Sequence, residues 1–214
     1  MSQKLIWATP DGDNLVAFMA RVSNPNAGMG DPAERLISYL IRNKHWSPFE
    51  MVSACVEVNT TRDISRQVLR HRSFSFQEFS GRYAAYDSLS DPREARLQDT
   101  HNRQNSLETA DQDLQNWWQE QQLAVRDLAS HSYEEALQRG IAKEVARALL
   151  PEGMTPTKMF MTGTLRSWIH YFQVRCTPET QKEHRQLAEA LRGLVFGQFP
   201  LIERAYENSL ATSH

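Results

Sequence analysis

Cysteine is scarce in this sequence, and no stretch of the chain is long and apolar enough for a membrane helix. The two cysteines, Cys55 and Cys176, form neither a disulfide framework nor a CxxC pattern for zinc or redox chemistry. A run of about 20 apolar residues is absent, and the opening residues, MSQKLIWATP, lack the apolar stretch of a secretion signal. We therefore expect a soluble cytoplasmic protein that does not contact membranes.

The chain also lacks an excess of positive charge. Its 24 Lys and Arg residues face 26 Asp and Glu residues, for a formal net charge of −2. Global attraction to DNA, RNA or anionic lipid is therefore not expected, and any anion must be bound by a local cluster. With 214 residues the chain can bury a complete core, and its length fits a single domain, residues 1–214.

Hydrophobic periodicity predicts both helices and a strand in the first part of the chain. The beginning reads as short helices, one of which has Asp31 as N-cap and Pro32 at its first position and stops at Asn43. Residues 51–59 alternate between apolar and other side chains, which predicts a half-buried strand. A helix entered through Thr60 or Thr61 follows. Residues on one face of that helix would be Arg66, Gln67, Arg70 and His71.

The later part reads mainly as helices. Residues 73–80 alternate and suit a second strand or an extended loop, whereas residues 87–109 are polar and unpatterned and are expected to form a mobile excursion. A long helix with Gly140 as its end signal follows, and then a short helix stopped by Pro151. Another helix covers residues 163–176, and one or two more close the chain.

The stretch RHRSFSFQEFSGRY, from Arg70 to Tyr83, places arginines among aromatic side chains. A solvated basic surface, the alternative, normally mixes Lys with acidic residues. Arginine pairs bidentately with phosphate and stacks on flat rings, so this stretch with Gln67 and Ser80 suits a mononucleotide. Phosphate would repel Glu78, which we expect to bind a ribose or to order the arginines.

Two further arginines lie in apolar helical patterns. Arg147 is part of EVARALLP, and Arg175 ends HYFQVR. A buried guanidinium needs an anionic or acceptor partner, so both are candidates for ligand contacts. The alternative is an internal ion pair, with Glu144 or Glu183 as the partner.

The stretch RHRSFSFQEFS resembles the RHR-x7-S motif of the flavin-dependent thymidylate synthases, with Arg70, His71, Arg72 and Ser80 in register. Further blocks in the family's order are ARVS, HWSPFE, SRQVLRHR, KEVARALLP and TGTLRSWIHYFQVR. Together they span most of the chain. The resemblance implies an α+β fold with a small, mostly antiparallel sheet flanked by helices and a helical C-terminal part. It also implies a homotetramer whose sites are built between subunits.

The resemblance further implies an activity and its ligands. dTMP would be made from dUMP, with methylenetetrahydrofolate as carbon donor and FADH2, regenerated by NADPH, as reductant. The residues implied to bind FAD are Ser47, Arg70, His71, Arg72, Glu78, Thr164, Arg166 and His170, with Ser23, His45 and Glu50 as weaker candidates. The residues implied to bind dUMP are Gln67, Arg70, Glu78, Ser80, Gly81, Arg82, Arg147 and Arg175. Departures from the family pattern are Thr164 for asparagine, Gln77 for asparagine and Glu179 for histidine.

The residue types also bear on the chemistry. Neither cysteine has a histidine arranged to activate it, so we expect no covalent cysteine nucleophile. Ser80 has arginines around it and no evident base, which favours phosphate binding. We predict that Arg175 is catalytic, because at the uracil edge its guanidinium would stabilise negative charge on the ring. On an unbroken helix Arg166 and His170 share a face, and Arg175 points to about the opposite side.

Two other classes of protein stay open. A non-catalytic mononucleotide- or RNA-binding module would use the arginines and phenylalanines to contact phosphates and bases, but the acidic net charge argues against it. A metal site of His45, His71 and His170 lacks HxxxH spacing and a close carboxylate, so no metal is expected.

Overall fold

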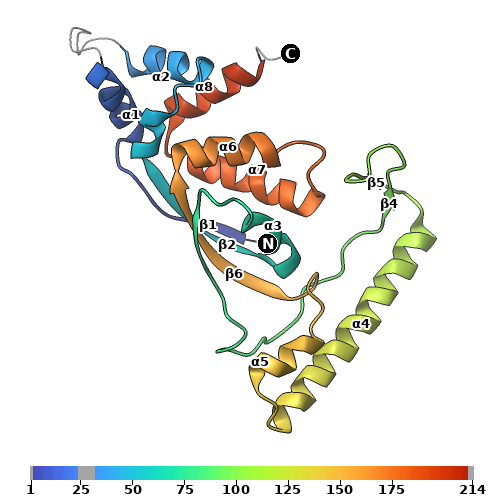
Figure 1. Cartoon of the computed structure of the whole chain (residues 1–214). Helices are drawn as coiled ribbons and strands as arrows, with labels where there is room; N and C mark the ends of the chain where they lie inside the picture. Colours follow the sequence, from blue (N-terminus) through green and yellow to red (C-terminus); the bar gives the residue numbers. More distant parts are fainter. Residues whose placement is uncertain (1, 24–31, 212–214) are drawn as a thin grey trace.

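The computed structural model describes residues 2–23 and 32–211, apart from the side chain of Ser23. The cofactor contact expected of Ser23 and the N-cap expected at Asp31 therefore lie outside the described residues. Figure 1 shows a twisted sheet covered by helices, and a long helix that stands away from it. In the described part of the chain no helix is both long and apolar enough to cross a bilayer.

Four strands form an antiparallel sheet in the order β1-β2-β6-β3. They are β1 (Ser2–Ala8), β2 (Ser53–Thr61), β6 (Pro156–Thr164) and β3 (Ser75–Glu78). In β2 the side chains of Ala54, Val56 and Val58 are fully buried, and the residues between them are partly exposed. The period of two in the sequence therefore predicted this strand and its buried face correctly, and the antiparallel sheet of an α+β fold is confirmed.

Two strands of this sheet were not predicted from the sequence. Residues 2–8, expected to belong to short helices, form the edge strand β1, so that expectation was wrong. The central strand β6 alternates as β2 does, with Met159 and Met161 buried and Lys158 and Phe160 exposed. Methionine favours helices over strands, which weakened the signal of this strand in the sequence.

Helices cover the buried face of the sheet (Figure 1). α6 (Leu165–Arg175) begins directly after β6 and is followed by α7 (Lys182–Phe196) and α8 (Pro200–Ala211), the two closing helices expected. Aromatic rings join them, since Phe172 stacks on Trp168 with ring centroids 5.7 Å apart and meets Phe196 edge-on at 5.1 Å. This aromatic cluster fixes the rotation of α6 about its axis.

The N-terminal helices pack against α8. They are α1 (Gly12–Ala20) and α2 (Ala33–Arg42), with short 3-10 turns η1 (Arg21–Ser23) and η2 (Ser47–Met51) after them. The buried carboxylate of Asp13 accepts from the backbone N–H groups of Leu201 and Ile202 at 3.0 and 3.3 Å, and so caps the start of α8. Pro32 is the N-cap of α2 rather than its first helical residue.

α3 (Arg62–Val68) follows β2, with Thr61 at its N-cap as expected. The helix is shorter than predicted, so Arg70 and His71 lie beyond its end. Arg66 instead reaches Glu152, with Nε 2.9 Å from Oε1. The single face of four polar residues was therefore a wrong expectation.

The excursion of residues 87–109 is not irregular throughout. It contains a hairpin of β4 (Arg96–Gln98) and β5 (Ser106–Glu108), and α4 (Gln112–Gln138) follows it. Gly140, with φ of 82°, lies just after α4, as its predicted end signal. α5 (Lys143–Ala146) and η3 (Arg147–Leu149) then lead to β6. α4 stands apart from the sheet in Figure 1, and it exposes Trp117, Val125 and Leu128.

Gly163 allows the Phe74 ring to pack on β6, which gives a stability prediction. A Cβ on Gly163 would lie 2.5 Å from Cδ1 of Phe74, and this ring meets Trp168 edge-on at 4.7 Å. We expect Gly163→Ala to lower the free energy of unfolding by about 1–3 kcal/mol in urea denaturation. Gly193 in α7 is the matched control: nothing lies within 4 Å of its Cβ position, so Gly193→Ala should be neutral or stabilising. Equal losses in both variants would contradict this packing.

Candidate functional site

A cleft beside the start of α6, which we call the α6 cleft, forms the first cluster of polar groups. Its volume is about 490 Å³. Thr164 is the N-cap of α6, where its hydroxyl accepts from the N–H of Ser167 at 3.4 Å and donates to Glu50 at 2.8 Å. The other oxygen of Glu50 accepts from Arg166 at 2.7 Å. The residues that line the cleft are Trp46, Glu50, Ser73, Thr164, Arg166, Ser167, Ile169, His170 and Gln173.

The α6 cleft brings together part of the predicted flavin set. Thr164, Arg166 and His170 line it, and so does Glu50, a weaker candidate. Ser47 is exposed at the start of η2, directly after the lining residue Trp46. The tryptophan was missed as a site residue although it lies in the HWSPFE block, because an aromatic residue in a short motif reads first as core.

The second cluster, which we call the His71–Arg175 junction, joins the RHR motif to the end of α6. Arg175 Nε donates to His71 Nε2 at 2.9 Å. Burial, followed by the charges of Arg175 and His170, lowers the pKa of His71 to about 4. His71 is therefore neutral at pH 7 and carries its proton on Nδ1, since Nε2 accepts. Arg70 and Arg72, on either side of it, are exposed.

Polar groups from the start of α7 extend this junction. His184 is fully buried, with Nε2 3.0 Å from the hydroxyl of Tyr171 and Nδ1 3.1 Å from Oε1 of Gln67. Burial, followed by the charges of Arg175 and His71, lowers the pKa of His184 to about 3. Gln181 accepts from Nε2 of Gln67 at 2.7 Å.

Sequence reasoning missed both of these α7 residues. Gln181 and His184 lie 114 and 117 residues along the chain from Gln67, and only the packing of α7 against α3 brings them together. Neither residue stands in a motif, so the sequence held no local signal for either.

A third cluster lies at α5. The Arg82 Nε is 3.3 Å from the carboxylate of Glu144, and the Arg147 Nε donates to the backbone oxygen of Glu144 at 3.2 Å. All three residues are exposed. Gly81 is needed beside them because a Cβ there would lie 2.6 Å from the ring of Tyr86.

Two expectations about the arginines on apolar helices need correction. Arg147 was expected to be buried, but it is exposed on η3, since that face of the turn points away from the core. The two internal ion pairs considered from the sequence do not form either. The carboxylate of Glu144 binds Arg82, and that of Glu183 binds Arg96.

Glu78 is held inside the chain. Its Oε1 accepts from Ser65 at 2.8 Å and from Thr157 at 2.9 Å, and Arg62 lies 4.0 Å away. These contacts tie β3 to α3 and β6. Ser80, two residues after Glu78, is the first residue of the turn after β3, where its backbone oxygen accepts hydrogen bonds from the turn.

Four of the predicted nucleotide residues therefore lie in two separate places on one chain. Gln67 and Arg175 lie at the junction beside α7. Arg82 and Arg147 meet at Glu144 on α5. α6 itself spans two sites, because its first turns line the α6 cleft and its last residue belongs to the junction.

The histidines considered as metal ligands do not converge. His45 packs edge-on against Tyr39 at 5.6 Å, His71 accepts from Arg175, and His170 lines the α6 cleft. Among the residues that the structure describes, no three His, Cys, Asp or Glu side chains are grouped as a metal ion would require.

The cysteines are unsuited to nucleophilic attack in this structure. Both are free thiols. Burial raises the pKa of Cys55 and of Cys176. A raised pKa keeps a thiol protonated at neutral pH, whereas a nucleophile must be a thiolate.

Known proteins resemble this chain over nearly its whole length. The model of the family called thymidylate synthase complementing protein matches residues 4–201. A flavin-dependent thymidylate synthase from Synechocystis sp. is 49% identical, covering 93% of this chain and 90% of the relative. A probable flavin-dependent thymidylate synthase of Paramecium bursaria Chlorella virus 1 is 45% identical, covering 97% of this chain and 99% of the relative.

Solved structures agree with this assignment. A UMP/dUMP methylase, PolB, from Streptomyces cacaoi, solved with 5-Br UMP, matches with a TM-score of 0.86 at 25% identity, over 97% of this chain and 94% of that one. The same methylase solved with 5-Br dUMP matches with a TM-score of 0.82. The motif, the fold and the relatives converge, and the chain belongs to the family of flavin-dependent thymidylate synthases.

Proposed function

We propose that this chain, as one domain, makes dTMP by reductive methylation of dUMP. Methylenetetrahydrofolate would donate the carbon, FADH2 would reduce it, and NADPH would regenerate the reduced flavin. The observation that carries the proposal is that α6 offers Arg166 and His170 to one cleft and Arg175 to a second cluster. A helix that serves two sites suits a reaction between a cofactor and a nucleotide. The names of relatives up to 49% identical support an enzyme rather than a non-catalytic binding module.

The groups in the α6 cleft fit a flavin. Trp46 offers a flat apolar surface for a ring system, and Arg166 offers a phosphate the guanidinium nitrogens that Glu50 does not bind. The hydroxyl of Thr164, which donates to Glu50, can accept a hydrogen bond from the ribityl chain. When bound, FAD supplies the hydride chemistry, and the protein supplies position and field. The remaining contacts that we propose for the flavin are those of Ser47, Arg70, His71, Arg72 and Glu78.

Arg175 is placed to act on the nucleotide base. Among the described residues only its Nε has a hydrogen-bond partner, so its two terminal nitrogens are left for a ligand. His71 orients the guanidinium without adding charge, because it is neutral. At the O4/N3 edge of uracil the guanidinium would stabilise negative charge as the ring is polarised.

We infer that the nucleotide site is completed between subunits of a homotetramer. Arg82 and Arg147 lie at α5, whereas Arg175 lies at the end of α6, so one chain presents two partial sets of nucleotide ligands. Among its exposed side chains α4 carries Trp117, Val125 and Leu128, which are apolar or aromatic residues of the kind found at the centre of an interface.

Replacement of Arg175 tests its catalytic role. Arg175→Ala should lower kcat for dTMP formation about 10²–10³-fold, the range seen when one donor to a developing negative charge is removed. Flavin content should be retained, because Arg175 does not line the α6 cleft. Arg204→Ala is the matched control, since Arg204 is an exposed arginine paired with Glu34 at 2.7 Å. Near-normal turnover by Arg175→Ala would show that Arg175 is not catalytic.

The cofactor and substrate can be tested directly on the purified protein. It should be yellow, with flavin absorbance, and should oxidise NADPH when dUMP is present and form dTMP when methylenetetrahydrofolate is added. UMP is the comparison substrate because PolB was solved with analogues of both nucleotides, and we expect dUMP to be preferred. A colourless protein that consumes no NADPH would favour the nucleotide-binding module instead.

A further inference from the structure

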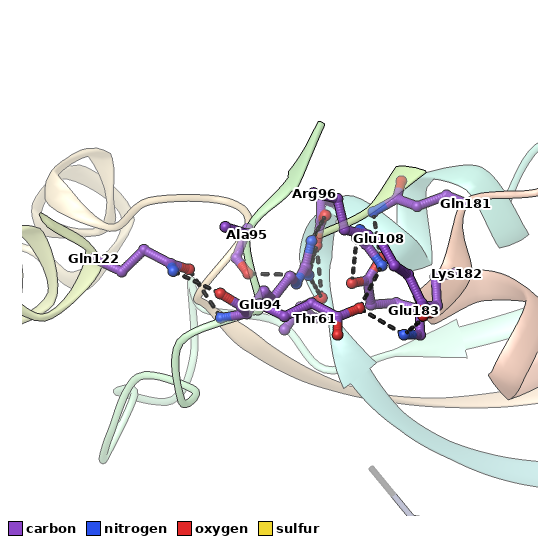
Figure 2. A network of polar contacts seen from close by, with 12 residues as sticks. Thr61, Glu94, Ala95, Arg96, Glu108, Gln122, Gln181, Lys182 and Glu183 are labelled. Carbon is purple, nitrogen blue, oxygen red and sulfur yellow. Dashed lines mark hydrogen bonds and ion pairs between the residues drawn. The ribbon is translucent and has the colours of Figure 1, made fainter. Parts of the chain in front are cut away.

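The polar excursion is tied to the start of α7 by largely buried charges. Arg96 Nη2 lies 2.6 Å from Glu183 Oε1, and only 12% and 10% of the two side chains are exposed. Figure 2 shows this pair, with Lys182 beside it, whose Nζ lies 2.7 Å from Glu94 and 2.5 Å from Glu108. The excursion is polar, yet the side chain of its Arg96 is largely buried against the start of α7.

From Glu183 a chain of hydrogen bonds runs through α7 and α3 to α6. Glu183 Oε2 accepts from Gln181 Nε2 at 2.9 Å, and Gln181 Oε1 accepts from Gln67 Nε2 at 2.7 Å. Gln67 Oε1 lies 3.1 Å from His184 Nδ1, and His184 Nε2 lies 3.0 Å from the hydroxyl of Tyr171. The first part of this chain, from Arg96 through Glu183 to Gln181, is visible in Figure 2.

The carboxylate of Glu183, where this series of hydrogen bonds begins, determines which group donates and which accepts at the next steps. Burial raises the pKa of Glu183, but hydrogen bonds from Gln181 and a backbone N–H, with the charge of Arg96, outweigh burial and keep the pKa below its ordinary value. An ionised carboxylate only accepts, so Gln181 must turn its NH2 toward Glu183 and its oxygen toward Gln67. Gln67 must then donate to Gln181, which leaves its oxygen to accept from His184. The orientation of both amides thus follows from one charge.

We propose that Arg96 is a positioning residue for the nucleotide site, because by holding Glu183 in the interior it fixes the amide of Gln67 in one orientation. Gln67 then offers a ligand its second N–H and its second lone pair at set places. An amide free to flip would present donor and acceptor in the opposite order, and a mismatched polar contact weakens binding. This role rests on the proposed function, since it takes dUMP as the ligand of Gln67.

Lys182 separates this role from simple anchoring of the excursion. Lys182 is next to Glu183 in the sequence and pairs with Glu94 and Glu108 of the excursion. It makes no contact with the hydrogen-bonded residues that lead from Glu183 to Gln67. Lys182→Gln therefore loosens the same attachment and leaves the direction of the amides intact.

The test uses the purified holoenzyme and measures KM for dUMP, kcat and flavin content. Arg96→Gln removes the positive charge that pairs with Glu183. Glu183→Gln keeps the size of the side chain but replaces the carboxylate, which can only accept hydrogen bonds, with an amide. We expect each to raise KM for dUMP about 10-fold, with kcat and flavin content little changed, because a charge-assisted contact is lost outside the reacting groups. Arg96→Lys should recover part of the loss. Lys182→Gln should leave KM unchanged.

A double-variant comparison completes the test. In a Gln67→Ala background, Arg96→Gln should not raise KM further, because the residue through which it acts is gone. An unchanged KM in both Arg96→Gln and Glu183→Gln, or an equal rise in the Gln67→Ala background, would overturn the positioning role and leave the proposed function standing. If Arg96→Gln does not fold, Glu183→Gln decides. A wild-type protein that neither binds dUMP nor makes dTMP would instead refute the proposed function.

Discussion

The packing of α6 against the end of the sheet determines where the groups of both candidate sites lie. α6 leaves β6 without a loop, and the N–H of Leu165 and the indole of Trp168 donate to backbone oxygens of Val52 and Ala54 at 2.8 and 3.2 Å. Burial of a large apolar side chain contributes about 1.5–3 kcal/mol, whereas an exposed ion pair such as Arg166 with Glu50 contributes about 0–1 kcal/mol. Packing therefore sets the rotation of α6, and the polar residues take the positions that remain.

Burial also sets the charge of the junction at the other end of α6. His71 and His184 are kept neutral mainly because burial disfavours the imidazolium, and the positive charge of Arg175 acts in the same direction. Arg175 is consequently the cation of this cluster, and His71 can accept its hydrogen bond. A protonated imidazole in that place would have no lone pair to offer.

The sequence predicted local features better than distant ones. The alternation around Val56 revealed β2, and the RHR motif with the block that carries Arg166 predicted residues that line or adjoin the candidate sites. The sequence did not predict β6, because its methionines have little preference for strands. Gln181 was missed because its partners come from distant parts of the chain, and Arg96 because a polar excursion reads as solvated surface until the fold shows its partner.

Because the predicted nucleotide ligands fall into two partial sets on one chain, we propose a site shared between subunits. Co-expression of differently tagged Arg147→Ala and Arg175→Ala chains, with the mixed oligomer purified through both tags, tests this sharing. If each site takes Arg147 from one chain and Arg175 from another, some sites in the mixture have both arginines intact, and dTMP formation should return well above that of either parent. Mixed oligomers as inactive as both parents would contradict a site shared between chains.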